Sequence, residues 1–479
     1  MHIYHANIIY TPESQRFEVV PHGYIAVNNG KVEGVYRELP EHLADCPLTD
    51  WGDRLLIPAM NDMHVHAPQY RNQGIAMDEE LLPWLENYTF PEELKYADTA
   101  YAEAMYRRFV RDLWRHGTMR VVAFASVHLE STRLLMHLLD EAGLGGRVGK
   151  VNMNRNCPKG LQESVEDAVK ACDILVEEFE KPHANSQFSI PNSQFPIPNS
   201  QFSIPNSQFS ILNSQFPIPN SQFSILNSQF PKVRPIVTPR FIPSCTPELL
   251  QACGEMARRY HLPVQSHLSE NHNEIAWVKE LEPQSRHYAD AYDRYGLLGQ
   301  TPTVMAHCVW TDGDELEMLR QRGVMVAHCP TSNFNVASGL APVRRFLDAG
   351  IPVGLGSDIS GGHDFSIFRM MVYAIQVSKM HYQRERARPA AKPCPFLSLS
   401  EAFWMGTKSA GRFFGKVGSF EPDYDFDALV IDDSDLLIDD SYTLLQRLER
   451  FVYIGDDRHI TARYCQGRLI PDPEKSVKS

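Results

Sequence analysis

The sequence lacks the features that would assign it to several other classes of protein. Its nine cysteines are odd in number and include no CxxC pair, so neither a disulfide framework nor a structural zinc ribbon is expected. It has no apolar run of about 18 residues, which predicts no membrane-spanning helix. The opening stretch MHIYHANIIYTPESQRF has no basic segment followed by an apolar one, unlike a signal peptide. These absences predict a cytoplasmic protein with reduced thiols.

Positive charge is also in short supply. The chain has 46 lysines and arginines against 59 aspartates and glutamates, and its formal net charge is −13. This balance disfavours a nucleic-acid backbone or an anionic membrane as the main partner. A small nucleobase carries no phosphate, so this class of ligand is still compatible with the charge.

Charged residues are missing altogether from residues 185–231. Here the heptad NSQF-[SP]-I-[PL] occurs six times in a row, and a seventh copy breaks off after Pro231. Proline at heptad positions five and seven rules out a coiled coil, and the odd period would turn successive phenylalanines of an extended chain to opposite faces. We predict a low-complexity insertion that is disordered or loosely extended, with Phe and Ile content that favours association.

The middle of the chain, residues 58–410, alternates short apolar runs with helix-like stretches. The predicted strands are residues 60–67, 119–126, 148–153, 234–241, 263–270, 303–309, 324–333 and 351–360. Helical patterns occur in TAYAEAMYRRFVRDLWRHG, ESVEDAVKACDILVEEFE, PELLQACGEMARRYH and GDELEMLRQRG. Eight strands alternating with helices predict an α/β fold, the TIM-like (β/α)₈ barrel. The repeat joins a helix to the fourth strand, so it is expected at the barrel face opposite the strands' carboxyl ends.

The sequence pattern at the two ends of the chain predicts short strands and turns. The tripeptide NNG before Lys31 is a hairpin signal. We predict that residues 1–57 and 411–479 pair into one small β-sandwich domain, with the barrel inserted between them.

Histidines and carboxylates gather at the predicted carboxyl ends of these strands. His64 and His66 alternate on the first strand and so face the same side. The fifth, sixth and eighth strands place His267 with Glu270, His307 and Asp358 at the same end of the barrel. Neutral imidazoles and a carboxylate suit a divalent transition metal such as Zn²⁺, with a position open for water. Any one of these residues alone could be structural, and His328 is left out of the set, but the combination predicts a metal-dependent hydrolase.

Four of these stretches resemble the metal-dependent amidohydrolase superfamily: PAMNDMHVHAPQY, HLSEN, AHCVW and GLGSDISGG. More specific ones, HAPQY, LLPWLENYTFPEE, VTPRF and QSHLSEN, are similar to the guanine deaminases of that superfamily. The resemblance runs from about Ile57 to about Gly467 except across the repeat, and it is weak over the first ~50 residues. It implies hydrolysis of guanine to xanthine and ammonia, as in purine catabolism or salvage, and a homodimer. The H-x-E…P-C-x-x-C signature of the unrelated zinc deaminases is absent.

The resemblance also implies roles for individual residues. One zinc per chain would be bound by His64, His66, His267 and Asp358. Glu270 would shuttle protons, and His307 would stabilise the attacking water or the forming oxyanion. His267, Glu270 and Asp358 would also contact the substrate, and the catalytic set would be Glu270, His307 and Asp358. The fourth strand ends in Arg240, where binuclear members carry a modified lysine, so a single metal is implied.

The base itself would be held by Gln69, Arg240 and Phe241. The guanidinium of Arg240 matches the O6/N7 edge of guanine, and Phe241 offers an apolar face to a flat ring. Without the resemblance, a surface salt bridge for Arg240 and ordinary core packing for Phe241 would be favoured. The aromatic stretch LLPWLENYTF could be a loop over the barrel mouth that excludes water, or the start of a packed helix.

Two alternatives remain open. One is a related amidohydrolase that deaminates another ring, such as a modified purine, a pterin, cytosine or a triazine. The other is a catalytically inactive scaffold whose repeat mediates binding. The pair Arg240 and Phe241, with Gln69, favours guanine among the rings, and the complete set of ligands with Glu270 argues against a scaffold.

Overall fold

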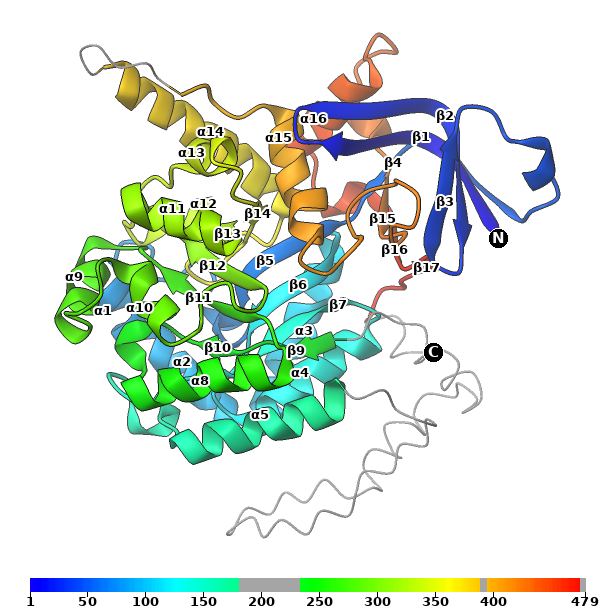
Figure 1. The fold of residues 1–479 in the computed structure, drawn as a ribbon. Coiled ribbons are helices and arrows are strands. Elements are labelled where there is room, and N and C mark those ends of the chain that lie inside the picture. The colour runs from blue at the N-terminus through cyan, green and yellow to red at the C-terminus, as the bar shows by residue number, and fades with distance from the viewer. Residues whose placement is uncertain (181–232, 388–393, 474–479) are drawn as a thin grey trace, which may run out of the picture.

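The computed structural model describes residues 1–180, 233–387 and 394–473. A sheet of four parallel strands forms the first half of its centre (Figure 1). In spatial order the strands are β5 (Met60–His66), β6 (Thr118–Phe124), β7 (Gly145–Gly149) and β9 (Val233–Pro235). β5 and β6 are buried along their whole length, which explains why the sequence shows continuous apolar runs there instead of alternation.

A second sheet of four parallel strands forms the other half. Its order is β11 (Val264–Leu268), β12 (Thr303–His307), β13 (Met325–His328) and β14 (Val353–Leu355). Two short strands, β8 (Val151–Asn152) and β10 (Thr238–Pro239), pair separately with each other. The eight strands of the two large sheets match the number expected, and the parallel pairing is confirmed.

Two of the predicted strands are placed differently from expectation. The third begins at Gly145, before the predicted 148–153, because Gly146 allows close approach to β6. A Cβ on Gly146 would lie 2.2 Å from the carbonyl oxygen of Val121. The fourth, predicted as 234–241, is split into β9 and β10, since Pro235 and Pro239 have no N–H to donate to a ladder.

The two parallel sheets adjoin at both edges. An isolated bridge pairs Val237 with Val264 at one junction. At the other, the amide of Asp358 donates to the carbonyl of His64 at 2.8 Å. Among the described residues, however, the ladders do not close into a continuous ring, so the expected closed barrel is not present as paired strands.

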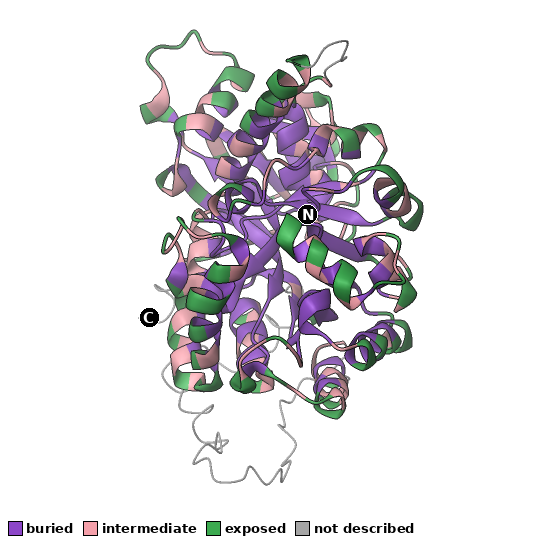
Figure 2. Ribbon diagram, turned by 90° about the vertical axis from the view of Figure 1, so that its left-hand side faces the viewer, coloured by how far each residue is buried: buried purple, intermediate pink, exposed green. Residues whose placement is uncertain are grey.

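Helices alternate with the parallel strands and cover them. Those of eight or more residues are α3 (Thr99–Arg115), α4 (Leu129–Glu141), α5 (Val165–Phe179), α8 (Pro247–Tyr260), α9 (His272–Leu281), α11 (Gly313–Arg322) and α14 (Ile367–Arg386). Shorter ones are α1 (Leu81–Trp84), α2 (Phe90–Glu93), α10 (Tyr288–Arg294), α12 (Pro330–Asn335), α13 (Val343–Asp348) and α15 (Leu399–Trp404). The four helices predicted from sequence are confirmed as α3, α5, α8 and α11. Figure 2 shows buried strands at the centre and helices whose outer faces are exposed.

The amino- and carboxyl-terminal segments share a third sheet. Its order is β17 (Arg468–Leu469), β16 (Ile460–Cys465), β15 (Ala428–Ile431), β4 (Leu48–Pro58), β1 (His2–Glu13), β2 (Arg16–Asn28) and β3 (Lys31–Tyr36). The helix α16 (Leu444–Ile454) lies between β15 and β16 in the chain. The predicted hairpin is present, with Asn29 and Gly30 at φ of 50° and 78° between β2 and β3. The expected sandwich of two sheets is corrected to one sheet, because β4 of the first segment pairs directly with β15 of the last.

A buried ion cluster ties this third sheet to the parallel sheets. Arg120 on β6 donates from Nε to Asp427 at 2.6 Å and from Nη2 to Asp425 at 2.7 Å. Arg120 and Asp427 are almost completely buried, so each charge depends on the other for compensation.

The predicted repeat at 185–231 lies outside the described residues. On either side of the undescribed residues, α5 ends at Phe179 and β9 begins at Val233. Every helix in the described ranges is too short or too polar to traverse a lipid bilayer.

Candidate active site

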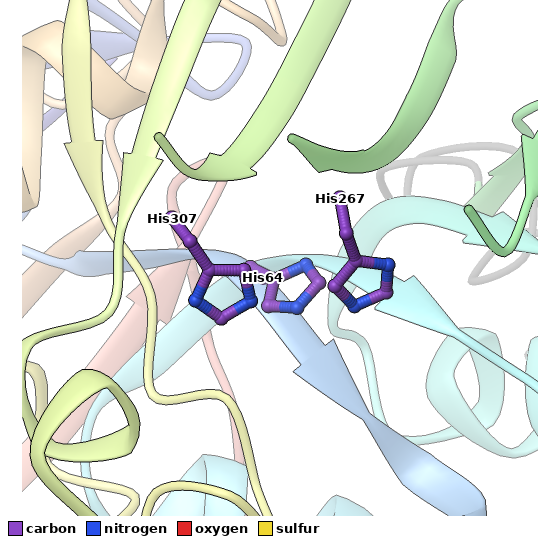
Figure 3. Close-up of side chains that lie close together, drawn as sticks. All are labelled: His64, His267 and His307. Atoms are coloured by element: carbon purple, nitrogen blue, oxygen red, sulfur yellow. The ribbon is translucent and has the colours of Figure 1, made fainter. Parts of the chain in front are cut away.

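Five side chains from the carboxyl ends of parallel strands meet at one point. His64 and His66 come from β5, His267 from β11, His307 from the end of β12 and Asp358 from the segment after β14. Figure 3 shows the side chains of His64, His267 and His307 gathered together, and their ring centroids lie 4.9 to 5.5 Å from one another. His307 and Asp358 have φ of 71° and 48°, a region that non-glycine residues rarely occupy. The turn that carries Asp358 is anchored to β5 by the hydrogen bond to the His64 carbonyl.

The side-chain atoms of this cluster are within a few ångströms of one another. Nε2 of His66 lies 3.1 Å from Nε2 of His267. Oδ1 of Asp358 lies 3.2 Å from Nε2 of His64 and 3.6 Å from Nε2 of His66. Oδ2 of the same carboxylate lies 3.7 Å from Nε2 of His307. The five residues that sequence analysis selected from four strands are thus brought together.

Burial and mutual proximity set the charge states in the cluster. Burial lowers the pKa of His64, and it lowers the pKa of His66 and of His267 well below the ordinary value. Burial by itself would raise the pKa of Asp358, but the surrounding His64, His307 and His66 outweigh it and lower that pKa. Neutral imidazoles beside an ionised carboxylate are the protonation states that a divalent cation requires of its ligands.

The hydrogen bonds of the cluster also fit a cation. Nδ1 of His267 lies 2.6 Å from the carbonyl oxygen of Arg240 and must carry the proton, because a carbonyl only accepts. The lone pair of neutral His267 is therefore on Nε2, the atom that faces His66. Nε2 of His64 is buried and has no hydrogen-bond partner among the described residues. A buried nitrogen without a hydrogen bond, close to a carboxylate and to other imidazoles, fits a metal site.

Three overlapping groups within the described residues have ligand atoms spaced closely enough for a metal. They are His64, His267 and His307; His64, His66 and Asp358; and His307, Cys329 and Asp358. Sequence analysis did not select Cys329, which follows His328 at the end of β13. The only sequence feature that pointed to Cys329 was its place at a strand end. The preceding residue, His328, is buried, and neither of its ring nitrogens has a hydrogen-bond partner among the described residues.

Glu270 lies beside this cluster and is held by its own helix start. Asn271 caps α9, and the side chain of Glu274 accepts the backbone amides of Glu270 and Asn271 at 3.0 and 3.3 Å. Oε1 of Glu270 accepts a hydrogen bond of 3.0 Å from Ser338, and Oε2 lies 3.5 Å from Nε2 of His307. Burial raises the pKa of Glu270 to about 7, against the opposing effect of His307. A carboxyl group with such a pKa can both accept and donate a proton near neutral pH.

A cavity opens directly above these groups. It encloses ≈ 440 Å³ of space not filled by atoms, a figure that includes adjoining solvent. Its polar walls include His66, Gln69, Arg240, His267, Glu270, Glu274, His307, Ser332 and Asp358, and its apolar walls include Leu81, Trp84, Leu85, Phe241 and Val336. The cavity therefore combines an apolar slot with a polar floor, and it contains all three predicted base-contacting residues.

The aromatic stretch LLPWLENYTF forms one apolar wall of this cavity. It is helical, comprising α1 and a π-helical turn (Leu85–Thr89) that leads into α2. Of the two alternatives for this stretch, the structure has the packed helix, because its apolar side chains bury against Phe124 and Phe241. These side chains cover one side of the pocket and keep it apolar.

The structure adds a residue that sequence analysis did not select. Glu93 is buried at the end of α2 and contacts both Arg240 and Gln69. It lies within the LLPWLENYTFPEE stretch, but its sequence position gave no sign that it would meet residues 24 and 147 positions away. Asn333, whose Oδ1 lies 2.9 Å from Nδ1 of His307, was missed for the same reason.

Comparison with known proteins places this arrangement in a family. Residues 223–470 match the Amidohydrolase family model. The chain is 32% identical over 492 aligned positions to a guanine deaminase of Dictyostelium discoideum, covering 98% of both chains. It is 33% identical to a guanine deaminase of Mus musculus, over 88% of this chain and 84% of that one. The crystal structure of a guanine deaminase from C. acetobutylicum, with guanine bound in its active site, superposes with a TM-score of 0.85 at 43% identity, covering 98% of this chain and 100% of that chain. The chain belongs to the amidohydrolase family.

Proposed function

We propose that this protein hydrolyses guanine to xanthine and ammonia, with one zinc ion per chain bound by His64, His66, His267 and Asp358. The observation that carries the proposal is a single cavity in which the histidine–aspartate cluster and Glu270 face the base-contacting side chains. Relatives that match nearly the whole chain are named guanine deaminase, and this similarity supports guanine as the substrate.

A divalent cation held by this cluster would lower the pKa of a bound water to about 7 and so supply a nucleophile at neutral pH. Glu270 accepts one proton of the attacking water and delivers it to a ring nitrogen. It then takes the remaining proton from the hydroxyl group on the tetrahedral carbon and delivers it to the amine, which leaves as ammonia while the carbonyl forms. Its pKa of about 7 and its place beside His307 suit both transfers. His307 has a pKa raised by Glu270 and Asp358 against its burial, so it can donate to the oxygen on which charge develops.

The remaining residues bind and orient the base. Arg240 and Gln69 present N–H donors to the acceptors of guanine, whose O6/N7 edge matches a guanidinium. Phe241 and the apolar side chains of the α1 segment enclose a flat ring and exclude bulk water. Adenine carries a donor at N6 in place of O6, so the same walls disfavour it.

The test is an assay of the purified protein with guanine. Loss of guanine absorbance should match the xanthine and ammonia formed, and prior treatment with a chelator should abolish the reaction until zinc is returned. Modified purines, a pterin, cytosine and a triazine form the comparison panel. Faster turnover of any of them than of guanine would favour the related-amidohydrolase alternative, and a protein without bound metal or turnover would favour the scaffold.

We also infer that the two parallel sheets are halves of one (β/α)₈ barrel spanning residues 58–410, flanked by a small β domain from 1–57 and 411–479. The Val237–Val264 bridge and the hydrogen bond between Asp358 and His64 support closure at the two junctions. A crystal structure with strand pairing between β14 and β5 would test the inference.

A further inference from the structure

We propose that Glu93 is a positioning residue that fixes Gln69 and Arg240 as hydrogen-bond donors toward the base, and so sets the selectivity of the pocket. The inference rests on the proposed guanine function. It concerns a residue outside the walls of the cavity, which acts only through the two side chains that do form those walls.

The carboxylate of Glu93 bridges the two base-contacting side chains. Oε2 accepts from Nη1 of Arg240 at 2.6 Å, and Oε1 accepts from Nε2 of Gln69 at 3.0 Å. All three residues are at most 3% exposed. The guanidinium of Arg240 also lies over the ring of Phe90, 5.2 Å from its centroid, so the same short helix holds Arg240 from two sides.

The bridge determines which way the amide of Gln69 points. The backbone amide of Ser360 donates to Oε1 of Gln69 at 3.2 Å, and a backbone N–H can only donate. An ionised carboxylate can only accept, so Nε2 must face Glu93. Both ends of the amide are therefore assigned by their partners, and a flipped amide would lose both hydrogen bonds.

Once these bonds are made, Gln69 and Arg240 offer a ligand only hydrogen-bond donors. Gln69 retains one N–H, and Arg240 retains the N–H groups that do not bond Glu93. A base that fits must offer acceptors at these positions, as guanine does with O6 and N7. Glu93 also supplies the negative charge beside buried Arg240, whose guanidinium would otherwise be uncompensated. Replacing Glu93 by glutamine keeps the shape but removes this charge, and it lets the amide of Gln69 turn an acceptor toward the ligand.

The test compares Glu93→Gln with Glu92→Gln, a matched control. Glu92 is the preceding residue on the same helix and is equally buried, but its carboxylate bonds Lys95 and Tyr101 instead of the pocket side chains. Zinc content, circular dichroism, kcat and KM are measured for guanine and for 2,6-diaminopurine, which carries an amino group in place of O6.

For Glu93→Gln we expect full zinc content and a KM for guanine raised about tenfold or more, with kcat within about threefold of the wild type. The preference in kcat/KM for guanine over 2,6-diaminopurine should fall about tenfold or more, because Gln69 and Arg240 no longer present donors alone. Glu92→Gln should change neither KM nor preference, even if it lowers the unfolding temperature. Glu93→Asp, which keeps the charge on a shorter side chain, should retain more of the preference than Glu93→Gln.

The inference is overturned if KM and preference in Glu93→Gln stay within about threefold of the wild type. Should that variant not fold, Glu93→Ala, which removes the charge and both hydrogen bonds, takes its place, and unchanged KM and preference in that variant overturn the inference instead. A wild-type protein that is active on other rings but inert toward guanine contradicts the proposed function itself, and this inference with it.

Discussion

Nε2 of His66 and Nε2 of His267 lie 3.1 Å apart, although the residues are 201 positions apart in the chain. The hydrogen bond to the Arg240 carbonyl leaves a lone pair on Nε2 of neutral His267. Burial lowers the pKa of both rings well below the ordinary value, which favours two neutral imidazoles. A neutral His66 can donate its own Nε2–H to that lone pair, or both rings can bind one cation through Nε2, an arrangement that the carboxylate of Asp358 beside His66 also suits.

His267→Ala is accordingly expected to lose metal and activity together. Elemental analysis of the wild type should give close to one zinc per chain, and the variant should retain less than about a tenth of it. His42→Ala, at an exposed histidine of the β-sheet segment, serves as the control and should keep both. Full zinc content in folded His267→Ala would remove this residue from the ligands.

Glu270→Gln separates proton transfer from metal binding. Glutamine keeps the hydrogen bond from Ser338 but cannot take a proton, so kcat should fall by roughly 10²–10⁴ while zinc content is unchanged. Ser338→Ala leaves the carboxyl group in place and should cost far less. Steady-state kinetics with parallel metal analysis provide the measurement, and a Glu270→Gln enzyme within about threefold of wild type would contradict the shuttle role.

Arg240→Lys tests whether the planar guanidinium of Arg240 recognises the base. Lysine keeps the positive charge beside Glu93 but cannot present paired donors, so kcat/KM for guanine should fall by about tenfold or more. Arg155→Lys is the matched control, because Arg155 lies near the same turn and its guanidinium donates to the carbonyls of Ile242 and Pro243. Equal kcat/KM in the two variants would mean that Arg240 has a structural role alone.

Arg120→Met addresses the junction between the parallel sheets and the terminal sheet. Removing the guanidinium leaves Asp425 and Asp427 without their buried counter-charge, a change that typically costs about 3–5 kcal/mol. Arg54→Met breaks a half-exposed pair with Asp432 and should cost about 1 kcal/mol or less. Urea unfolding midpoints of both variants against the wild type give the comparison.

The destabilisation caused by Arg120→Met should depend on pH in a defined direction. Burial opposes ionisation of Asp425, but Arg120 outweighs it and lowers the pKa of that carboxyl group. The stabilisation is therefore complete above the unfolded pKa of about 4 and is lost as the pH falls through the lower folded value. The gap in unfolding midpoint between the wild type and Arg120→Met should narrow below about pH 4, and a gap independent of pH would argue against the ion cluster as its cause.

Deletion of residues 185–230 should leave guanine deamination nearly intact. The segment joins the end of α5 at Phe179 to the start of β9 at Val233, at the strand end away from His64 and Asp358, and it has no titratable side chain. We expect kcat/KM within about threefold of the full chain and improved solubility, since repeated Phe and Ile are removed. A folded deletion variant with activity lowered about tenfold would show that the repeat contributes to function.

Sequence alone determined the parts of this protein that depend on local spacing. Alternating apolar runs and amphipathic stretches predicted eight parallel strands and the helices α3, α5, α8 and α11, because side-chain periodicity directly reflects backbone geometry. The pair His64 and His66 could be placed on one side of a strand for the same reason. The family resemblance then connected these positions with Gln69 and Arg240, which the cavity contains together.

Only the tertiary structure decided the contacts between distant segments. No periodicity links Glu93 to Arg240, or Ser338 to Glu270, since each contact depends on how separate helices and strands pack. The single terminal sheet has the same origin: β4 and β15 each carry a strand pattern, but their pairing across more than 350 positions is set by which apolar faces bury against each other. Local sequence specifies what each segment becomes, and packing free energy selects its partners.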